Sequence, residues 1–173
     1  QPKDAKEAQD LLYTAFQTKR PFCIRYPRGN VHYEKNPSYQ EIEVGTWQKT
    51  IIGTPEQVVI TYGPDVDHVI EKARANHLMV INARFFKPID TKMIDLICRM
   101  NLPITVYETD MKTGGLASAI LEYLNAKEKR ITSIGIEDHY VCHGPVRSLR
   151  IQEGISTDQL FTQLESTSSK DEK

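Results

Sequence analysis

The stretch VVITYGPDVDHVIEKARANHLMVI, residues 58–81, contains the pattern that decides the fold. Residues 58–62 form a β-branched apolar run that is typical of a buried strand. The turn at 63–65 opens a helix that extends to about residue 76, and residues 78–81 form the next apolar strand. A strand, a helix and a second strand in this order predict two parallel strands joined by a crossover helix.

The same alternation continues towards the C-terminus. Further strands are predicted at 104–107 and 131–136, and further helices at about 90–98, 116–124, 146–153 and 156–164. All four predicted strands are short and almost continuously apolar, as expected for strands that are buried on both faces. The sequence therefore predicts an α/β fold with a mostly parallel sheet covered by helices on both faces.

The residues before this domain predict one helix and one strand of a different unit. Asp4 and Glu7 have the spacing of a capping box, in which Asp takes the cap position. An apolar face then follows at helical spacing, made of Ala8, Leu11, Leu12, Ala15 and Phe16. Residues 22–24 are predicted as a short buried strand. A helix and a strand alone cannot form a domain, so they are interpreted as the end of a preceding α/β domain.

Four segments follow from this interpretation. Residues 1–30 end one domain, 31–48 form a linker of mixed polarity, 49–166 form the main domain and 167–173 form a polar tail. The sequence starts with neither Met nor a signal-peptide pattern, and we expect it to be part of a longer chain.

The bulk composition excludes several classes of protein. The chain has 173 residues and a net charge of −1, with a pI near 6.6, so no basic surface for nucleic acid is indicated. No apolar run approaches the ~18 residues of a membrane span. Cys23, Cys98 and Cys142 form no C-x-x-C pair, which is typical of reduced thiols. We expect a cytoplasmic protein that binds neither nucleic acid nor membranes.

Residues 25–29, RYPRG, are the first candidate site. Arg25 and Arg28 flank a proline that stiffens the turn, and Gly29 permits close approach of the backbone to a ligand. The planar guanidinium group suits bidentate binding of phosphate or carboxylate. An interdomain salt bridge is the alternative interpretation of these arginines.

Three other segments carry polar residues at positions where sites often form. Glu108, Thr109 and Asp110 precede the pair Gly114-Gly115 between a strand and a helix, and a tight turn with capping carboxylates is favoured over a ligand site. Arg84 and Lys87 follow a strand end, where they are placed to face a cleft. The third segment contains His139, Cys142 and His143, which lack the paired spacing of zinc ligands. A structural role is therefore favoured for these three side chains.

Several of these segments together resemble the 1-deoxy-D-xylulose 5-phosphate synthase family, which belongs to the transketolase superfamily. The matching segments are residues 21–30 (PFCIRYPRGN), 81–90 (INARFFKPID), 108–118 (ETDMKTGGLAS) and 140–144 (YVCHG). They occur in the family's order, and the resemblance is to its C-terminal portion. The resemblance implies a transketolase-type C-terminal domain, a three-layer α/β/α sandwich, preceded by the end of the pyrimidine-binding domain.

The resemblance also implies a function for the longer parent chain. The family condenses pyruvate with glyceraldehyde 3-phosphate, with loss of carbon dioxide, to give 1-deoxy-D-xylulose 5-phosphate for isoprenoid biosynthesis. Its cofactors are thiamine diphosphate and Mg²⁺, whose binding residues lie upstream of the matching region, so this chain alone is expected to be inactive. The second arginine of the family's Arg-Tyr-Pro-Arg-Gly motif contacts the acceptor phosphate, and this position is Arg28. The family implies a homodimer whose upstream domains adjoin this chain.

The chain departs from the family pattern at the turn before the fourth helix. Thr109 and Asp110 stand where the family usually has Glu-Asn, and Ala117 stands where it has glycine. These departures indicate a divergent member of the family, with an altered substrate as one interpretation. Two alternatives stay open: the parent is a transketolase or the β chain of a 2-oxo-acid dehydrogenase, or the chain is a non-catalytic interaction module of the same fold.

Overall fold

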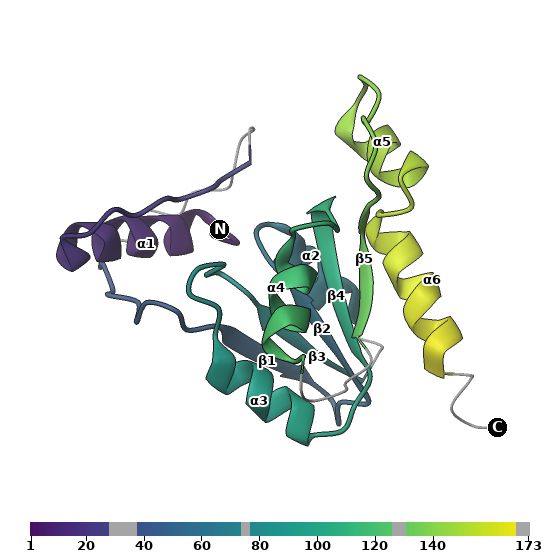
Figure 1. Ribbon diagram of the computed structural model, residues 1–173, viewed down its shortest axis with the longest axis horizontal. Helices are drawn as coiled ribbons and strands as arrows, with labels where there is room; N and C mark the ends of the chain where they lie inside the picture. Colours follow the sequence, from purple (N-terminus) through teal and green to yellow (C-terminus); the bar gives the residue numbers. More distant parts are fainter. Residues whose placement is uncertain (28–37, 74–76, 126–130, 169–173) are drawn as a thin grey trace. The chain divides into compact units, whose positions relative to one another are not determined.

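The computed structural model describes residues 1–27, 38–73, 77–125 and 131–168 (Figure 1). The chain divides into two compact units, Gln1–Leu102 and Pro103–Lys173. Unit 1 contains residues on both sides of the domain boundary predicted near residue 49, and that boundary stays a prediction.

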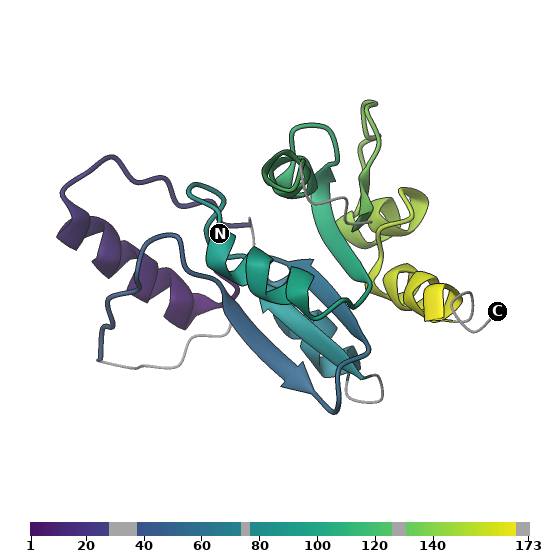
Figure 2. The same ribbon diagram turned by 60° about the horizontal axis from the view of Figure 1, so that its bottom comes forward.

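Unit 1 is built on three strands. Its described elements are α1 (Ala5–Thr18), β1 (Gln48–Ile52), β2 (Gln57–Thr61), α2 (Asp65–Lys72), β3 (Leu78–Asn82) and α3 (Thr91–Arg99). β2 pairs in parallel with β3, and β1 pairs antiparallel with the other edge of β3. The three strands lie side by side in Figure 2. Val80 is therefore flanked by Val59 on one side and Thr50 on the other.

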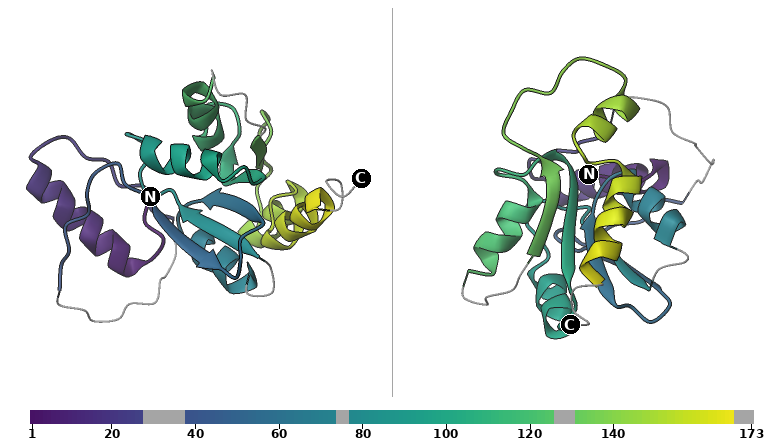
Figure 3. Two further views of the ribbon diagram at one scale, coloured as in Figure 1. Left: turned by 90° about the horizontal axis from the view of Figure 1, so that it is seen from below. Right: turned by 90° about the vertical axis from the view of Figure 1, so that its right-hand side faces the viewer.

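Helices lie on both sides of these strands. α2 and α3 are on opposite sides of the β1-β3-β2 group in the left view of Figure 3. The strand residues between them are closely packed, since Val58, Val59 and Ile60 are 0% exposed. This burial on two faces explains why β2 and β3 are almost continuously apolar.

Unit 2 has a smaller arrangement of the same kind. It contains β4 (Ile104–Met111), α4 (Leu116–Tyr123), β5 (Ile131–Ile136), α5 (Val146–Gln152) and α6 (Thr157–Ser168). β4 and β5 are parallel, and α4 and α6 lie on opposite sides of the pair in the right view of Figure 3. The buried Tyr107 hydroxyl donates a 2.7 Å hydrogen bond to the carbonyl oxygen of Ile155. This bond joins β4 to the start of α6.

The predicted α/β class with mostly parallel strands is confirmed, but one strand was not predicted. The sequence predicts no strand at β1, because QKTII mixes polar and apolar residues; Gln48 ends the predicted linker and the other four residues open the predicted main domain. Its exposure explains the missing signal. β1 lies at the edge of the three-strand group, and within it only Thr50 and Ile52 are half-buried. An exposed edge strand of this kind does not need a continuous run of apolar residues.

Two predictions for the opening region are wrong. Residues 22–24 are irregular rather than a strand, since no neighbouring strand within the described residues pairs with them. Of the predicted apolar face of α1, only Leu11 is buried. Glu7, Asp10, Leu11 and Thr14 are buried, whereas Leu12 is 52% and Phe16 76% exposed.

The helices within the described ranges include none that combines the length and the apolar character needed to cross a membrane.

Candidate functional site

A cavity of about 740 Å³ lies in unit 1, between the segment that follows α1 and the loop that follows β3. Its lining includes four basic side chains, those of Arg20, Arg25, Arg84 and Lys87. No acidic side chain from the described residues contributes to the lining. Apolar side chains, among them Phe22 and Phe85, form the remaining wall. Fixed positive charge beside an apolar wall suits an anionic group carried on a small organic body.

Aromatic contacts shape one side of this cavity. The Arg25 guanidinium carbon lies 5.0 Å from the centre of the Phe86 ring, within the range of a cation–π interaction. Phe86 in turn packs edge-to-face against Tyr62, with ring centres 4.6 Å apart. Phe85 is 5% exposed and meets Phe22 edge-on at 6.2 Å. The two phenylalanines after β3 therefore pack against other aromatic side chains, as expected for apolar residues.

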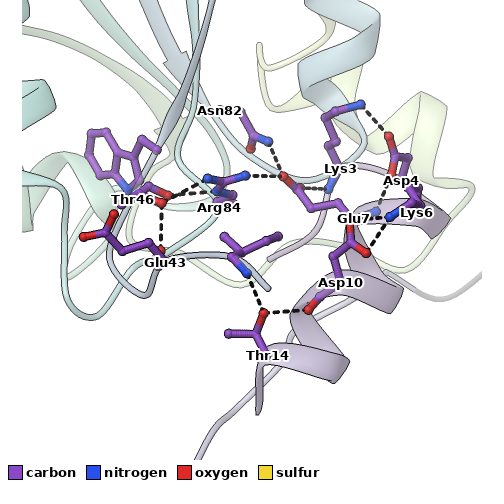
Figure 4. Close-up of polar contacts among 12 residues, drawn as sticks. Lys3, Asp4, Lys6, Glu7, Asp10, Thr14, Glu43, Thr46, Asn82 and Arg84 are labelled. Carbon is purple, nitrogen blue, oxygen red and sulfur yellow. Dashed lines mark hydrogen bonds and ion pairs between the residues drawn. The ribbon is translucent and has the colours of Figure 1, made fainter. Parts of the chain in front are cut away.

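Arg84 is held rigidly by the segment that precedes β1. Its Nε donates to the Thr46 carbonyl oxygen at 2.8 Å, and its Nη2 donates to the Thr46 hydroxyl at 3.0 Å. Its Nη1 lies 3.7 Å from Glu7 Oε1, as Figure 4 shows. Two directional bonds and a nearby carboxylate fix the guanidinium, so Arg84 mainly anchors the cavity wall. Its placement beside a cleft is as predicted.

Glu7 is the centre of the polar network in Figure 4. This side chain is 6% exposed, and its two oxygens accept hydrogen bonds from Asn82 Nδ2 at 2.8 Å and from the Lys3 backbone N–H at 2.7 Å. A buried carboxylate is stable only when hydrogen bonds and opposite charge replace water, and Arg84 supplies the charge. The sequence predicts Glu7 as part of the helix cap and does not predict this role. The polar residues at 7, 10 and 14, which follow helical spacing, were the available signal.

Charged groups at the start of α1 stabilise one another. The Asp4 carboxylate accepts a 2.7 Å hydrogen bond from the Glu7 backbone N–H, as the predicted cap requires. Burial acts to raise the pKa of Asp4, but the hydrogen bonds from Glu7 and Lys3 outweigh it and hold that pKa below its usual value. Burial acts to lower the pKa of Lys3, and its bonds to Asp4 and Asp67 outweigh that effect and raise it. Both groups are therefore held in their charged forms at neutral pH.

Arg28, the predicted phosphate-binding residue, lies outside the described residues. Arg25, three positions earlier in the chain, lines the cavity together with Lys87. Arg20 also lines the cavity and is exposed, and the sequence does not predict it as a site residue. Its position just beyond the end of α1 carried no distinguishing motif.

The turn at Glu108 in unit 2 is a helix cap, as favoured from sequence. Glu108 is 1% exposed, and its carboxylate accepts hydrogen bonds from the backbone N–H groups of Leu116 at 2.6 Å and Ala117 at 3.0 Å. A Cβ placed on Gly115 would lie 2.6 Å from Glu108 Oε2, which explains the glycine there. The carboxylate occupies the N-terminus of α4, where an anionic ligand would otherwise bind.

The segment with His139, Cys142 and His143 has a structural contact. His139 Nε2 lies 2.8 Å from the Glu153 carboxylate at the end of α5, which ties the loop after β5 to that helix. Cys142 and His143 are exposed. In the ranges that the structure describes, no three His, Cys, Asp or Glu side chains are grouped as a metal site would need.

The described residues thus combine an α/β fold with mostly parallel strands, a cation-lined cavity that includes Arg25, and a buried glutamate that caps α4. The family model for the transketolase C-terminal domain matches residues 50–160. The chain belongs to this family. The match begins within β1 and ends within α6, and α1 lies ahead of it in the chain.

Curated relatives of this transketolase C-terminal domain agree on one enzyme family. The chain is 36% identical over 166 residues to a 1-deoxy-D-xylulose-5-phosphate synthase from Aquifex aeolicus, covering 91% of the chain and 26% of the relative. It is 36% identical over 160 residues to the synthase from Thermus thermophilus, covering 91% and 26% respectively. The chain thus spans about a quarter of the length of these relatives. The predicted resemblance to a C-terminal portion of these synthases is confirmed.

A solved structure supports the fold. A split gene transketolase, described as an inactive β4 tetramer, superimposes with a TM-score of 0.80 at 20% identity, covering 95% of this chain and 55% of that one. At this identity the likeness bears on the fold alone, and it confirms the predicted transketolase-like architecture.

Proposed function

We propose that this chain is the C-terminal portion of a synthase that condenses pyruvate with glyceraldehyde 3-phosphate to 1-deoxy-D-xylulose 5-phosphate, with loss of carbon dioxide. The supporting observation is 36% identity to synthases of that name over 91% of the chain. The cation-lined cavity beside the RYPRG segment adds a chemical reason, because the acceptor carries a phosphate.

We propose that the chain contributes binding rather than reacting groups. Arg28 holds the acceptor phosphate, and Arg25 and Lys87 give the described cavity positive charge. Binding energy gained at a remote phosphate orients the reacting aldehyde, so this contact raises the rate as well as the affinity.

The family's cofactors are thiamine diphosphate and Mg²⁺, and the resemblance places the residues that bind them upstream of the matching region. The proposal therefore places cofactor binding on the remaining three-quarters of the polypeptide. The chain alone is expected to be inactive, and the parent is expected to be a homodimer.

The first test is the full-length polypeptide supplied with thiamine diphosphate, Mg²⁺, pyruvate and glyceraldehyde 3-phosphate. NMR detection of 1-deoxy-D-xylulose 5-phosphate is the expected result. Release of carbon dioxide without that product would replace the proposed acceptor with another. Absence of both from a folded, cofactor-bound enzyme would favour the non-catalytic module.

The proposed role of Arg28 is tested by comparing an acceptor that carries the phosphate with one that lacks it. Loss of charge-assisted hydrogen bonds worth about 1.5–3 kcal/mol predicts that Arg28→Ala lowers kcat/KM for glyceraldehyde 3-phosphate by about ten- to a hundredfold or more. Glyceraldehyde without the phosphate is the control substrate, for which the same variant should change kcat/KM little. Equal losses with both substrates would assign Arg28 to folding instead.

A further inference from the structure

Thr46 contacts the Arg84 guanidinium group twice, and both contacts lie along one edge of that group. The Arg84 Nε–H donates to the Thr46 carbonyl oxygen at 2.8 Å, and Nη2 donates to the Thr46 hydroxyl at 3.0 Å. A guanidinium group has five N–H donors in a fixed planar arrangement. Thr46 therefore uses two of these donors, and three remain, two on Nη1 and one on Nη2.

The three remaining donors are available to a ligand in the cavity. Arg84 lines that cavity, and its side chain is 17% exposed. Within the described residues these donors make no hydrogen bond, because the nearby Glu7 Oε1 is 3.7 Å from Nη1. Neighbouring N–H groups of one guanidinium bind two oxygens of a phosphate at the same time. Arg84 is thus fixed along one edge and free along the other.

Thr46 orients Arg84 without neutralising it. Both of its acceptor atoms are uncharged, so the guanidinium keeps its positive charge for an anion. Glu7 contributes less to the orientation, since its oxygens accept hydrogen bonds from Asn82 and from the Lys3 N–H. A side chain that is already ordered loses less conformational entropy when the ligand binds.

The Thr46 hydroxyl is itself held in place. It donates to the Glu43 carbonyl oxygen at 2.7 Å, as Figure 4 shows, and this directs its lone pairs towards Arg84 Nη2. The next residue, Trp47, donates from its indole N–H to the Phe85 carbonyl oxygen at 2.8 Å. The segment that contains Thr46 is therefore bonded to two consecutive residues of the loop after β3.

We propose that the Thr46 hydroxyl is a positioning group for acceptor binding. It holds the Arg84 guanidinium in the orientation that presents the free N–H groups to a phosphate in the cavity. This inference rests on the proposed function, because it concerns the phosphate of the same acceptor. Thr46 acts through Arg84 and contacts no reacting atom.

The test is Thr46→Val in the full-length polypeptide, which removes the hydroxyl and keeps the carbonyl oxygen that binds Nε. Loss of the ordered guanidinium predicts a kcat/KM for glyceraldehyde 3-phosphate that is lower by about two- to tenfold. The Kd of inorganic phosphate, measured by calorimetry, should rise by a similar factor. Glyceraldehyde without the phosphate should keep its kcat/KM, and Thr46→Ser, which retains the hydroxyl, should restore the wild-type values.

Two controls separate this effect from a general loss of structure. Thr50→Val makes the same chemical change in β1, outside the cavity lining, and should leave phosphate binding and both kcat/KM values unchanged. In an Arg84→Lys background, Thr46→Val should have little further effect, because the hydroxyl acts through the guanidinium.

Four results would overturn the inference. These are wild-type phosphate binding in Thr46→Val, equal losses with glyceraldehyde and its phosphate, a Thr46→Ser variant as weak as Thr46→Val, and a wild-type protein that does not bind inorganic phosphate. If Thr46→Val prevents folding, Thr46→Ala replaces it, with the same expected results. A wild-type polypeptide that forms no product would refute the proposed function, and phosphate calorimetry of the variants would then decide the positioning role by itself.

Discussion

Substitution of Gly115 tests the buried carboxylate that organises unit 2. A Cβ at this position would lie 2.6 Å from both Glu108 Oε2 and the Met111 carbonyl oxygen. Glu108 has little freedom to move aside, because it is 1% exposed and bonded to the N–H groups of Leu116 and Ala117. Gly115→Ala therefore forces the carboxylate or the backbone to shift.

The expected cost follows from two effects. Overpacking a buried site by one methyl group costs about 1–3 kcal/mol. Weakening one hydrogen bond to the charged Glu108 adds about 1.5–3 kcal/mol. We expect Gly115→Ala to lower the free energy of unfolding by about 3–5 kcal/mol, a large share of the total for a domain of this size.

Two other glycines of unit 2 are controls for this cost. At Gly144 the nearest atom to a new Cβ is Leu149 Cδ2 at 3.5 Å, an ordinary contact, so Gly144→Ala should change stability by less than about 0.5 kcal/mol. A Cβ at Gly114 would meet no atom within 4 Å, but the φ angle there is +74°. Gly114→Ala should therefore cost about 1–2 kcal/mol through backbone strain alone. Urea unfolding followed by circular dichroism at 222 nm measures all three.

A double variant isolates the clash itself. Glu108→Asp shortens the side chain and withdraws the carboxylate from position 115. The double variant with Gly115→Ala should therefore lose at least about 1 kcal/mol less than the sum of the single losses. Additive losses would refute the clash with Glu108, and a Gly115→Ala variant as stable as Gly144→Ala would refute the steric argument as a whole.

Two further variants test unit 1. Arg84→Lys removes the paired bonds to Thr46 and should lower the free energy of unfolding by about 1–3 kcal/mol, followed by the fluorescence of the adjacent, buried Trp47. Lys87→Met, at an exposed position of the same loop, is the control. An equal loss of stability in the Arg84→Lys and Lys87→Met variants would contradict the anchoring role of Arg84. Asp4→Asn keeps a capping side chain but removes the charge, and should destabilise the chain by up to about 1 kcal/mol at pH 7. Because the pKa of Asp4 is lowered by folding, its charge stabilises the fold above the ordinary pKa of about 3.9, and the difference should vanish as the pH falls through the folded value. A difference that is constant with pH would contradict this assignment.

Local sequence determined most elements of this protein. The cap predicted at Asp4 is confirmed by a hydrogen bond from the Glu7 N–H at 2.7 Å, and the helix predicted from about residue 90 begins with Asp90 accepting from the Met93 N–H at 2.9 Å. The strands at 57–61 and 78–82 follow the apolar runs closely. Caps and buried strands are predictable because their determinants lie within a few residues of one another.

The candidate site was only partly predictable. Arg84 and Lys87 were expected beside a cleft, and both line the cavity. Arg20 was missed, since its place in the lining depends on the path of the chain after α1 and on no local motif. The phosphate-binding role of Arg28 stays a prediction.

Tertiary structure alone decided which side of α1 is buried. By sequence the apolar face with Leu12 and Phe16 should face inward, yet the structure buries Glu7 against Asn82 and Arg84. These two partners of Glu7 lie more than seventy residues away from it in the chain, so no local sequence pattern contains this pairing. β1 gives the same lesson, because an edge strand is defined by its neighbour β3 rather than by its own composition. The sequence determines where backbone elements form through short-range propensity and capping, whereas burial of polar groups depends on which distant partners satisfy them.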